Sequence, residues 1–396
     1  MRLRLAVGTW RGSRDSWPVK AIPGTNRMRN QNRLFLGQTI AIPVLALSLL
    51  AACAGCTATT STPRSTEPAA YSAPDSSWSN AHPMGSVPLP RDAHGMTYDS
   101  TNGKVVLFGG KGTRSHYFND TWTYTPATNT WNKLQPSGIL PTGRFGGAMV
   151  YEPAARKLLV FGGVLGTTGQ PANDLWAYSF NANTWTRLHP PGAAPPARVY
   201  PSMAYDPATG KAILFGGWTG TSAFADTWTY DPATSTWRKL HTTGSPHARW
   251  GASMVYDSAT GKLILFGGLF GSYDGSNRLN DTWQYDPATN TWKNLAPAGQ
   301  LPPARGYASM VYDSATGKVI LYGGFAGSHG LLADTWEYDP SANAWHRLPP
   351  GATNPSRRDF SSAVYAQQAN MIILFGGQTG NTGNVNATDL NDTWHR

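Results

Sequence analysis

Six segments of the chain share one pattern of hydrophobic and polar positions. In the copy at 250–295, a run of alternating residues ends at Tyr256, and a polar turn leads to the apolar run KLILFGG at 262–268. A variable stretch then leads to DTWQYD at 281–286, and a second polar turn leads to TWKNL at 291–295. Alternation predicts half-buried strands, and a short continuous apolar run between turns predicts a strand buried on both faces. Each copy therefore predicts four short strands joined by tight turns.

The copies align on a few fixed positions. A tyrosine ends the first strand and recurs every 51–56 residues, at Tyr98, Tyr151, Tyr205, Tyr256, Tyr312 and Tyr365. A double glycine ends the second strand, at 109–110, 162–163, 216–217, 267–268, 323–324 and 376–377. A tryptophan lies in the third strand, and in the first five copies another follows nine residues later. A four-stranded sheet of this size cannot enclose a core alone, so a period near 50 predicts the blades of a β-propeller.

The aromatic-Gly-Gly end of the second strand, the aromatic residue of the third and the tryptophan of the fourth resemble the kelch motif. The resemblance covers residues 76–396 in six copies. It implies an all-β, six-bladed β-propeller of four-stranded kelch repeats, similar to the central domain of galactose oxidase, with the first strand of each blade innermost.

The two ends of the repeat region predict how the ring closes. The last copy stops at Arg396 before a fourth strand, whereas Trp78 lies thirteen residues before Arg91, a spacing that recurs between Trp131 and Arg144. We therefore expect residues 76–81 to be a fourth strand that completes the last blade. Closure of this kind removes exposed sheet edges, which otherwise promote aggregation.

The residues before the repeats resemble an export signal. Residues 1–27 have no apolar periodicity, and we interpret them as an unstructured extension or as a start assigned too early. Residues 28–52 have a basic start, an apolar run and small residues before Cys53, as a secretory signal does. The sequence LAAC ending at Cys53 resembles the lipobox of bacterial lipoproteins, which implies cleavage before Cys53 and lipid attachment to it. An uncleaved membrane anchor or plain secretion are the alternatives, and residues 53–75 are predicted to be a Ser/Thr/Pro-rich tether.

Charge and cysteine content narrow the possible functions. The formal net charge is +10, but residues 1–52 hold eight basic residues and one acid, so the rest of the chain is close to neutral. This distribution predicts no nucleic-acid partner. Both cysteines, Cys53 and Cys56, precede the repeats. The copper site of galactose oxidase needs a Tyr–Cys crosslink, so that cofactor is excluded here, and we expect no cofactor.

Loop lengths predict which face of the propeller binds a ligand. The turns between strands one and two and between strands three and four have constant lengths. The loop between the double glycine and the Asp before strand three has 9, 10, 8, 12, 9 and 14 residues in the six copies. Variable loops on a rigid scaffold are where binding residues accumulate. We therefore expect the functional surface on the face of the 2–3 and 4–1 loops, hereafter the loop face, around the mouth of the central channel.

Aromatic residues outside the repeat pattern fall on this face. The candidate ligand-binding rings are Trp218, Trp250, Tyr200, Tyr307, Phe145, Phe325 and Phe360. Such rings stack on sugars or hold peptide side chains. The alternative is that several of them fill the channel or pack the loops. Asp92, Asp359 and His94 are further candidates, because each differs from the repeat consensus close to the predicted mouth.

An arginine lies seven residues before each repeat tyrosine, at Arg91, Arg144, Arg198, Arg249, Arg305 and Arg358. Six arginines around a channel suggest an anion site. Each blade also has an aspartate before its third strand, and a residue present in every blade usually serves the blade. We therefore favour an Arg–carboxylate bond within each blade. His94, His116 and His329 have no metal-ligand spacing, so we predict no metal site.

These observations favour a binding module. We expect a monomeric, envelope-anchored propeller that recognises a glycan or a protein on the loop face, with a membrane contact only through lipid on Cys53. Some kelch-type propellers are sugar mutarotases or epimerases, which implies an alternative in which Asp92, His94 and Asp359 supply an acid and a base. A scaffold for other envelope proteins is a third possibility.

Overall fold

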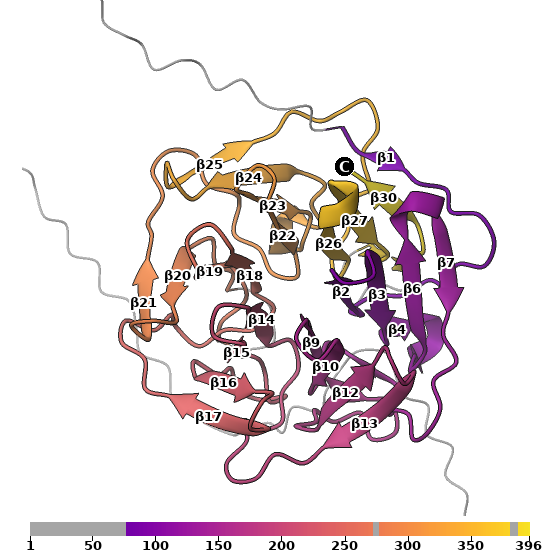
Figure 1. Ribbon diagram of the computed structural model, residues 1–396. Helices are drawn as coiled ribbons and strands as arrows, with labels where there is room; N and C mark the ends of the chain where they lie inside the picture. The colour runs from indigo at the N-terminus through magenta and orange to yellow at the C-terminus, as the bar shows by residue number, and fades with distance from the viewer. Residues whose placement is uncertain (1–76, 272–276, 381–386) are drawn as a thin grey trace, which may run out of the picture. The chain divides into compact units, whose positions relative to one another are not determined.

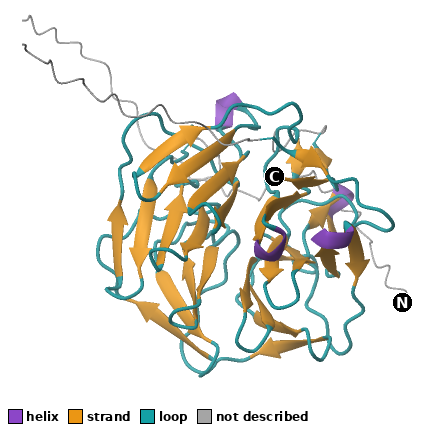
Figure 2. Ribbon diagram, turned by 45° about the horizontal axis from the view of Figure 1, so that its top comes forward, coloured by secondary structure: helices purple, strands orange, loops and turns teal. Residues whose placement is uncertain are grey.

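The computed structural model describes residues 77–271, 277–380 and 387–396. Over these residues it is an all-β propeller of six four-stranded antiparallel sheets arranged as blades around a central channel (Figure 1). Strands make up nearly all of the regular structure, and the short helices are confined to loops and turns (Figure 2). The all-β fold class, the number of blades and the four strands in each blade confirm the sequence predictions.

Each blade begins with a strand next to the channel. The six inner strands are β2 (Gly95–Asp99), β9 (Ala148–Glu152), β14 (Ser202–Asp206), β18 (Ser253–Asp257), β22 (Ser309–Asp313) and β26 (Ser362–Ala366). The second strands are β3 (Lys104–Phe108), β10 (Lys157–Phe161), β15 (Lys211–Phe215), β19 (Lys262–Phe266), β23 (Lys318–Tyr322) and β27 (Met371–Phe375). After its first residue, each second strand is buried throughout, as its apolar sequence predicts.

The outer half of each blade carries the tryptophan positions that recur among the repeats. The third strands are β6 (Thr121–Thr125), β12 (Leu175–Ser179), β16 (Thr227–Asp231), β20 (Thr282–Asp286), β24 (Thr335–Asp339) and β30 (Thr393–His395). The outermost strands are β7 (Thr130–Lys133), β13 (Thr184–Leu188), β17 (Thr236–Leu240), β21 (Thr291–Asn294), β25 (Ala344–Arg347) and β1 (Ser79–Asn80). We number the blades 1 to 6 in the order of their inner strands.

Short elements complete the structure. Two-residue strands form three small ladders on the loop face, β4 (Lys111–Gly112) with β5 (His116–Tyr117), β8 (Arg144–Phe145) with β11 (Val164–Leu165), and β28 (Gln378–Thr379) with β29 (Thr388–Asp389). The 3-10 helices are η1 (Thr113–Ser115), η2 (Pro126–Thr128), η3 (Gly327–His329) and η4 (Gln367–Ala369). No described helix is long and apolar enough to cross a membrane.

Blade 6 is completed by the N-terminal strand. Strand β1 pairs with β30, with Ser79 opposite His395 and Asn80 opposite Trp394. The side chain of Trp78 is only 1% exposed and packs against Tyr322 of blade 5, with ring centroids 5.3 Å apart. The predicted closure is therefore confirmed for the described residues of this segment.

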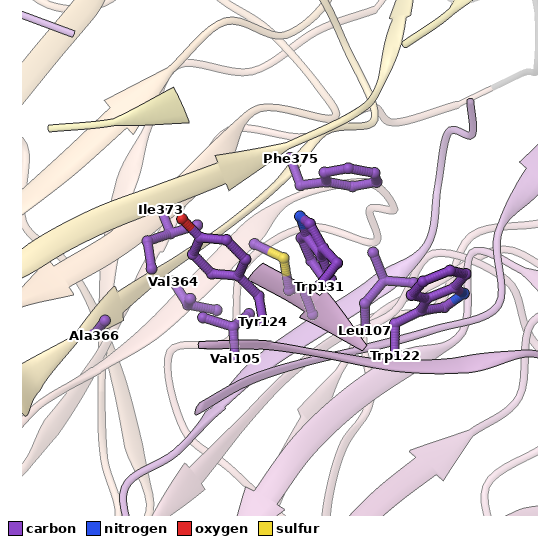
Figure 3. Packing of buried hydrophobic residues seen from close by; sticks show 10 residues of the cluster. Val105, Leu107, Trp122, Tyr124, Trp131, Val364, Ala366, Ile373 and Phe375 are labelled. Atoms are coloured by element: carbon purple, nitrogen blue, oxygen red, sulfur yellow. The ribbon is translucent and has the colours of Figure 1, made fainter. Parts of the chain in front are cut away.

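The hydrophobic core lies between neighbouring blades, not within one blade. At the junction of blades 1 and 6, Trp131 and Tyr124 pack against Phe375 and Ile373 (Figure 3). The indole N–H of Trp131 donates to Thr393 Oγ1 across the same junction at 3.1 Å. Each blade therefore depends on its neighbours to bury its apolar faces, as expected for repeats that cannot fold singly.

Candidate functional site

The six arginines before the inner strands are structural. Each donates two hydrogen bonds to the aspartate before strand three of its own blade, and the shortest N–O distance in each pair is 2.6 or 2.7 Å. The same guanidinium donates to the carbonyl of the first glycine in the double glycine, as Arg91 does to Gly109 at 3.0 Å. The arginine side chains are at most 2% exposed, so none presents an anion site on the surface. The predicted bond within each blade is confirmed.

These ion pairs also change the ionisation of the aspartates. For Asp120, burial raises the pKa, but the hydrogen bonds and charge of Arg91 lower it more, and the net shift is downward. The indole of Trp122 donates to the same carboxylate at 2.8 Å. The shift is also downward for Asp174, Asp226, Asp281 and Asp334. The carboxylates therefore stay ionised and hold each 2–3 loop to its blade.

A closed ring of main-chain hydrogen bonds surrounds the channel just after the arginines. Each residue donates its N–H to the carbonyl of the equivalent residue one blade back, at 2.7–3.1 Å. The six residues are Ala93, Gly146, Tyr200, Gly251, Tyr307 and Phe360. All six have positive φ, between 49° and 65°. This conformation is strained for residues other than glycine, and the complete ring compensates for that strain.

Three side chains of this ring close the channel mouth. The ring centroids of Tyr307 and Phe360 are 4.0 Å apart, and those of Tyr200 lie 5.1 Å from Tyr307 and 5.3 Å from Phe360. The three rings line a cavity of about 210 Å³ together with His94 and Ser361. All three rings are half-buried, so each fills the channel and also presents an edge or face to solvent on the loop face.

The two tryptophans predicted to bind a ligand are buried. Trp218 is 3% exposed and Trp250 is 2% exposed, and they pack with Val164, Val199 and Leu269. They support the loop face from below and do not form its surface. Both tryptophans therefore pack the loops, which is the alternative stated above for these rings.

The remaining aromatic candidates are half-buried. The ring of Phe145 lies 5.5 Å from that of Tyr117 and 6.0 Å from that of Tyr200, which continues the aromatic surface outward from the mouth. Phe325 lies apart from this group and packs against the guanidinium of Arg278 at 4.4 Å. We use the term aromatic strip for Tyr117, Phe145, Tyr200, Tyr307 and Phe360.

A second feature of the loop face is a difference between blades. In each blade the residue after the arginine pairs in antiparallel fashion with the residue after the double glycine. In blades 2 to 5 these pairs are apolar or contain glycine, namely Phe145–Val164, Val199–Trp218, Trp250–Leu269 and Gly306–Phe325. In blades 1 and 6 they are Asp92–Lys111 and Asp359–Gln378. These paired positions are therefore polar only in blades 1 and 6, which are neighbours in the ring.

Asp389 joins this junction from the 2–3 loop of blade 6. It stands opposite Gln378 in the β28–β29 ladder, and its neighbour Leu390 accepts a hydrogen bond from the N–H of Arg91 at 3.0 Å. Burial raises the pKa of Asp92 well above its usual range, and the charge of Asp389 raises it further. Burial also raises the pKa of Asp389, while its hydrogen bond with Asp92 and the charge of Lys111 oppose this. We call Asp92, Lys111, Asp359, Gln378 and Asp389 the polar junction.

Two members of this group, Asp92 and Asp359, are candidates from the sequence, and the other three are not. Lys111 and Gln378 could have been found by comparing the residue after the double glycine in all six copies. Asp389 lies in the longest 2–3 loop, where the copies have no common spacing, so no sequence signal identified it.

His94 is buried beside the channel between blades 1 and 6. Its ring packs edge-on against Phe375 with centroids 5.4 Å apart, and neither ring nitrogen has a hydrogen-bond partner among the described residues. Burial and then the charge of Arg91 lower its pKa to about 3, so the imidazole is neutral near pH 7. Among the described residues, no group of His, Cys, Asp and Glu side chains is suited to hold a metal ion.

The opposite mouth of the channel is wider and is built from repeat positions. A cavity of about 460 Å³ is lined there by the repeat tyrosines and by Met96, Met149, Met203, Met254 and Met310. Several tyrosines hydrogen-bond to a carboxylate of the preceding blade. Burial, followed by the charge of Glu152 and a hydrogen bond to it, raises the pKa of Tyr205 to about 12. These contacts join neighbouring blades, so we assign this mouth a structural role.

Comparison with known proteins identifies the family. Residues 53–268 and 208–395 match the family model described as the KLHDC2/KLHL20/DRC7 Kelch-repeats domain. The chain belongs to the kelch-repeat family. A kelch relative, an F-box/kelch-repeat protein of Arabidopsis thaliana, is 27% identical over 332 residues, which cover 74% of this chain and 67% of that protein. Human Kelch domain-containing protein 3 is 27% identical over 299 residues, covering 69% of this chain and 74% of the relative.

Another relative is named as an enzyme. The N-(sulfonatooxy)prop-2-enimidothioate sulfolyase of Thlaspi arvense is 29% identical over 271 residues, covering 63% of this chain and 74% of that protein.

The signal at 28–52, the tether at 53–75 and Cys53 lie outside the described residues, and they stay predictions. Kelch propellers are commonly protein-interaction modules, and this chain has the same architecture.

Proposed function

We propose that this kelch propeller is an exported interaction module that holds a protein or a glycan on its loop face. The supporting observation is that repeat residues and non-repeat residues have different roles in each blade. The repeat arginines, aspartates, tyrosines and tryptophans are used inside and between blades, whereas the aromatic strip and the polar junction depart from the repeat. Half-buried aromatic rings on a rigid surface supply contact area at low entropic cost.

Capture from an extract of the source cells, together with a glycan array, tests this proposal. The loop-face variants are Phe145→Ala and Tyr117→Ala, which remove strip residues outside the main-chain ring. The matched control is Gln367→Ala, which lines the opposite mouth. We expect both loop-face variants to lose one and the same partner while the control retains it, with unchanged melting in all three. Retention of that partner by the loop-face variants would contradict the proposal.

We also propose that the propeller is tethered outside the cell membrane by lipid on Cys53. The support is the position of LAAC directly after the apolar run, followed by residues 54–75 of tether composition. Mass spectrometry of the mature N-terminal peptide should find acyl groups on Cys53, and Cys53→Ala should release the protein from membranes. An unmodified mature terminus elsewhere would contradict this part.

A second candidate function is a sugar mutarotase or epimerase at the loop-face mouth. The polar junction favours it, because Asp92 and Asp389 share a hydrogen bond and ionise differently, as a general acid and a general base must. A relative that is 29% identical to this chain is named as a sulfolyase, which supports an enzymatic alternative. Exchange of sugar anomers followed by NMR tests it, and we expect Asp92→Asn and Asp389→Asn each to abolish any acceleration. Acceleration that survives both substitutions would contradict a role for this pair.

A further inference from the structure

The serines that begin four of the inner strands form a second set of bonds around the channel. In blades 3 to 6 the hydroxyl group of this serine donates to a main-chain carbonyl of the next blade, at 2.6–2.8 Å. The donors are Ser202, Ser253, Ser309 and Ser362, and the acceptors are the carbonyls of Ala252, Ala308, Ser361 and His94. Each acceptor residue directly follows a member of the main-chain ring, so the serine bonds join the blades next to that ring.

This set of bonds is incomplete in blades 1 and 2. Gly95 and Ala148 occupy the serine position, each at the first residue of its inner strand. Neither residue has a hydroxyl group, so the carbonyls of Gly147 and Pro201 lack the bond that the other four carbonyls receive. A carbonyl that is withdrawn from water without a donor costs free energy. Two hydrogen-bond acceptors on neighbouring blades are therefore left for a donor that the chain does not supply at this position.

The residues that carry these two carbonyls line the cavity of about 210 Å³ at the channel mouth, together with His94. The side chain of His94 is 5% exposed, and neither of its ring nitrogens has a hydrogen-bond partner among the described residues. Buried polar groups in folded proteins are rarely unpaired, so this imidazole indicates a partner from outside the chain. A neutral imidazole has one donor and one acceptor. The cavity therefore has at least three acceptors and one donor for a ligand.

The rest of the wall determines the charge and size of that ligand. The described residues that line the cavity include no Asp, Glu, Lys or Arg, so a neutral ligand fits best. Tyr200, Tyr307 and Phe360 form an aromatic wall, on which the C–H face of a sugar can stack. A cavity of about 150 Å³ can hold a benzene ring, so this cavity has room for one six-membered ring with substituents. Gly147 and Ser253 are half-buried, so solvent reaches the wall.

We propose that this cavity binds one neutral hexopyranose ring, with two hydroxyl groups donating to the carbonyls of Gly147 and Pro201 and a third bonded to His94. The ring belongs to a free monosaccharide or to the end of a glycan. Hydroxyl groups donate and accept in several directions, which matches this wall, whereas a purely apolar ligand leaves both carbonyls unpaired. An acidic sugar finds no free cation, because the six repeat arginines are paired within their blades. This inference rests on the proposed function and deepens it by naming a neutral sugar as the ligand.

The probes for this site are methyl β-D-glucopyranoside, methyl β-D-galactopyranoside and methyl α-D-mannopyranoside. In NMR titrations of the mature protein, at least one of them should shift the imidazole signals of His94 and the amide signal of Gly147. Cyclohexanol has the same ring size with one hydroxyl group, and N-acetylneuraminic acid is an acidic sugar. Both should bind at least tenfold more weakly. A trisaccharide that ends in the preferred sugar identifies the source, because it binds equally well if the ligand is a glycan end and fails to bind if only the free sugar fits.

Ala148→Ser tests the role of the missing hydroxyl group. It supplies the side chain that blades 3 to 6 have at this position, and its hydroxyl group should donate to the carbonyl of Pro201. The variant should melt at or above the temperature of the parent protein and bind the sugar about fivefold more weakly, the usual value of one neutral hydrogen bond. Ala233→Ser is the matched control, in an exposed turn where blade 5 has Ser341, and should bind the sugar as the parent does.

His94→Ala serves as a second variant and should also weaken sugar binding by about fivefold. Failure of all three glycosides to bind, equal binding of cyclohexanol, or unchanged sugar affinity in both Ala148→Ser and His94→Ala would each overturn this inference. The outcome is separable from the proposed function. Loss of partner capture in Phe145→Ala and Tyr117→Ala would still support the loop face if no glycoside bound. Sugar binding with partner capture intact in those two variants would support the cavity and contradict the proposed function.

Discussion

The indole N–H of Trp78 donates a hydrogen bond to the hydroxyl group of Thr335 at 3.2 Å, across 257 residues of sequence. Trp78 precedes the strand that completes blade 6, and Thr335 begins β24 of blade 5. The contact repeats one found at other blade junctions, where Trp185 donates to Thr121 and Trp292 donates to Thr227. The N-terminal segment therefore occupies the position of an ordinary fourth strand.

Trp78→Ala should destabilise the propeller strongly. Removing a buried tryptophan from a packed core costs about 3–5 kcal/mol of unfolding free energy. Urea unfolding followed by fluorescence measures this loss, and deletion of residues 77–81 should lower stability further because β30 loses its partner. His82→Ala, just beyond the strand, is the control and should unfold like the parent protein. Unchanged unfolding of the deletion variant would refute closure through β1.

The buried Arg–Asp pairs predict unequal effects of similar substitutions. Asp334→Asn leaves Arg305 buried without its counter-charge, and we expect a loss of about 3–5 kcal/mol of unfolding free energy. Lys211→Met removes the exposed Lys211–Asp231 pair, in which the N–O distance is 3.4 Å, and should cost less than about 1 kcal/mol. Chemical denaturation of both variants measures the difference. Equal costs would show that the six internal pairs do not hold the blades.

The lowered pKa of His94 predicts a loss of folding stability in mild acid. Its folded-state pKa of about 3 lies below the ordinary value of 6.5, so the unfolded chain takes up a proton first as the pH falls. The stabilising contribution is complete above pH 6.5 and is lost as the pH falls toward 3, at about 1.4 kcal/mol per pH unit.

Melting temperatures of the parent protein and of His94→Ala at several pH values test the effect. The variant has the residue found at the equivalent position in blades 4 and 5, Ala252 and Ala308. Its stability should fall less steeply between pH 6.5 and 5, whatever its stability at pH 7. Parallel pH profiles for the two proteins would exclude His94 as the cause.

Asp92 predicts the opposite dependence on pH. Its folded-state pKa is raised, so stability is complete below the unfolded pKa and is lost as the pH rises toward the folded value. Asp92→Asn removes this ionisation and should raise the melting temperature near pH 8, with little gain near pH 3.5. Asp313→Asn, at the end of β22, serves as the control substitution. A stability gain of equal size at both pH values would contradict the assignment.

The repeat made most of the fold predictable from the sequence. The tyrosine, double-glycine and tryptophan positions recur at fixed spacing, so blade number and strand order follow from local pattern alone. The Trp78–Arg91 spacing added ring closure, and the recurrence of Arg with Asp predicted their pairing. Each of these inferences uses information that is present in several copies.

The arrangement of the loop face is harder to predict from the sequence, because it depends on contacts between copies. Trp218 and Trp250 were predicted to be ligand-binding residues, yet they are buried under the loop face. Nothing local distinguishes a buried loop tryptophan from an exposed one. Asp389 approaches Asp92 only because the ring brings blade 6 beside blade 1, a relationship that has no trace in sequence spacing.

The closed ring of main-chain hydrogen bonds has a consequence for how this protein could change over generations. Each of its six residues has one bond to each neighbour, so duplication or loss of a single repeat would require the whole ring to close again at a different diameter. Repeat copy number is therefore constrained by the backbone itself. New specificities would arise by substitutions and insertions in individual loops. Blades 6 and 1 depart most from the others, and they are adjacent in the ring although they lie at opposite ends of the repeat region.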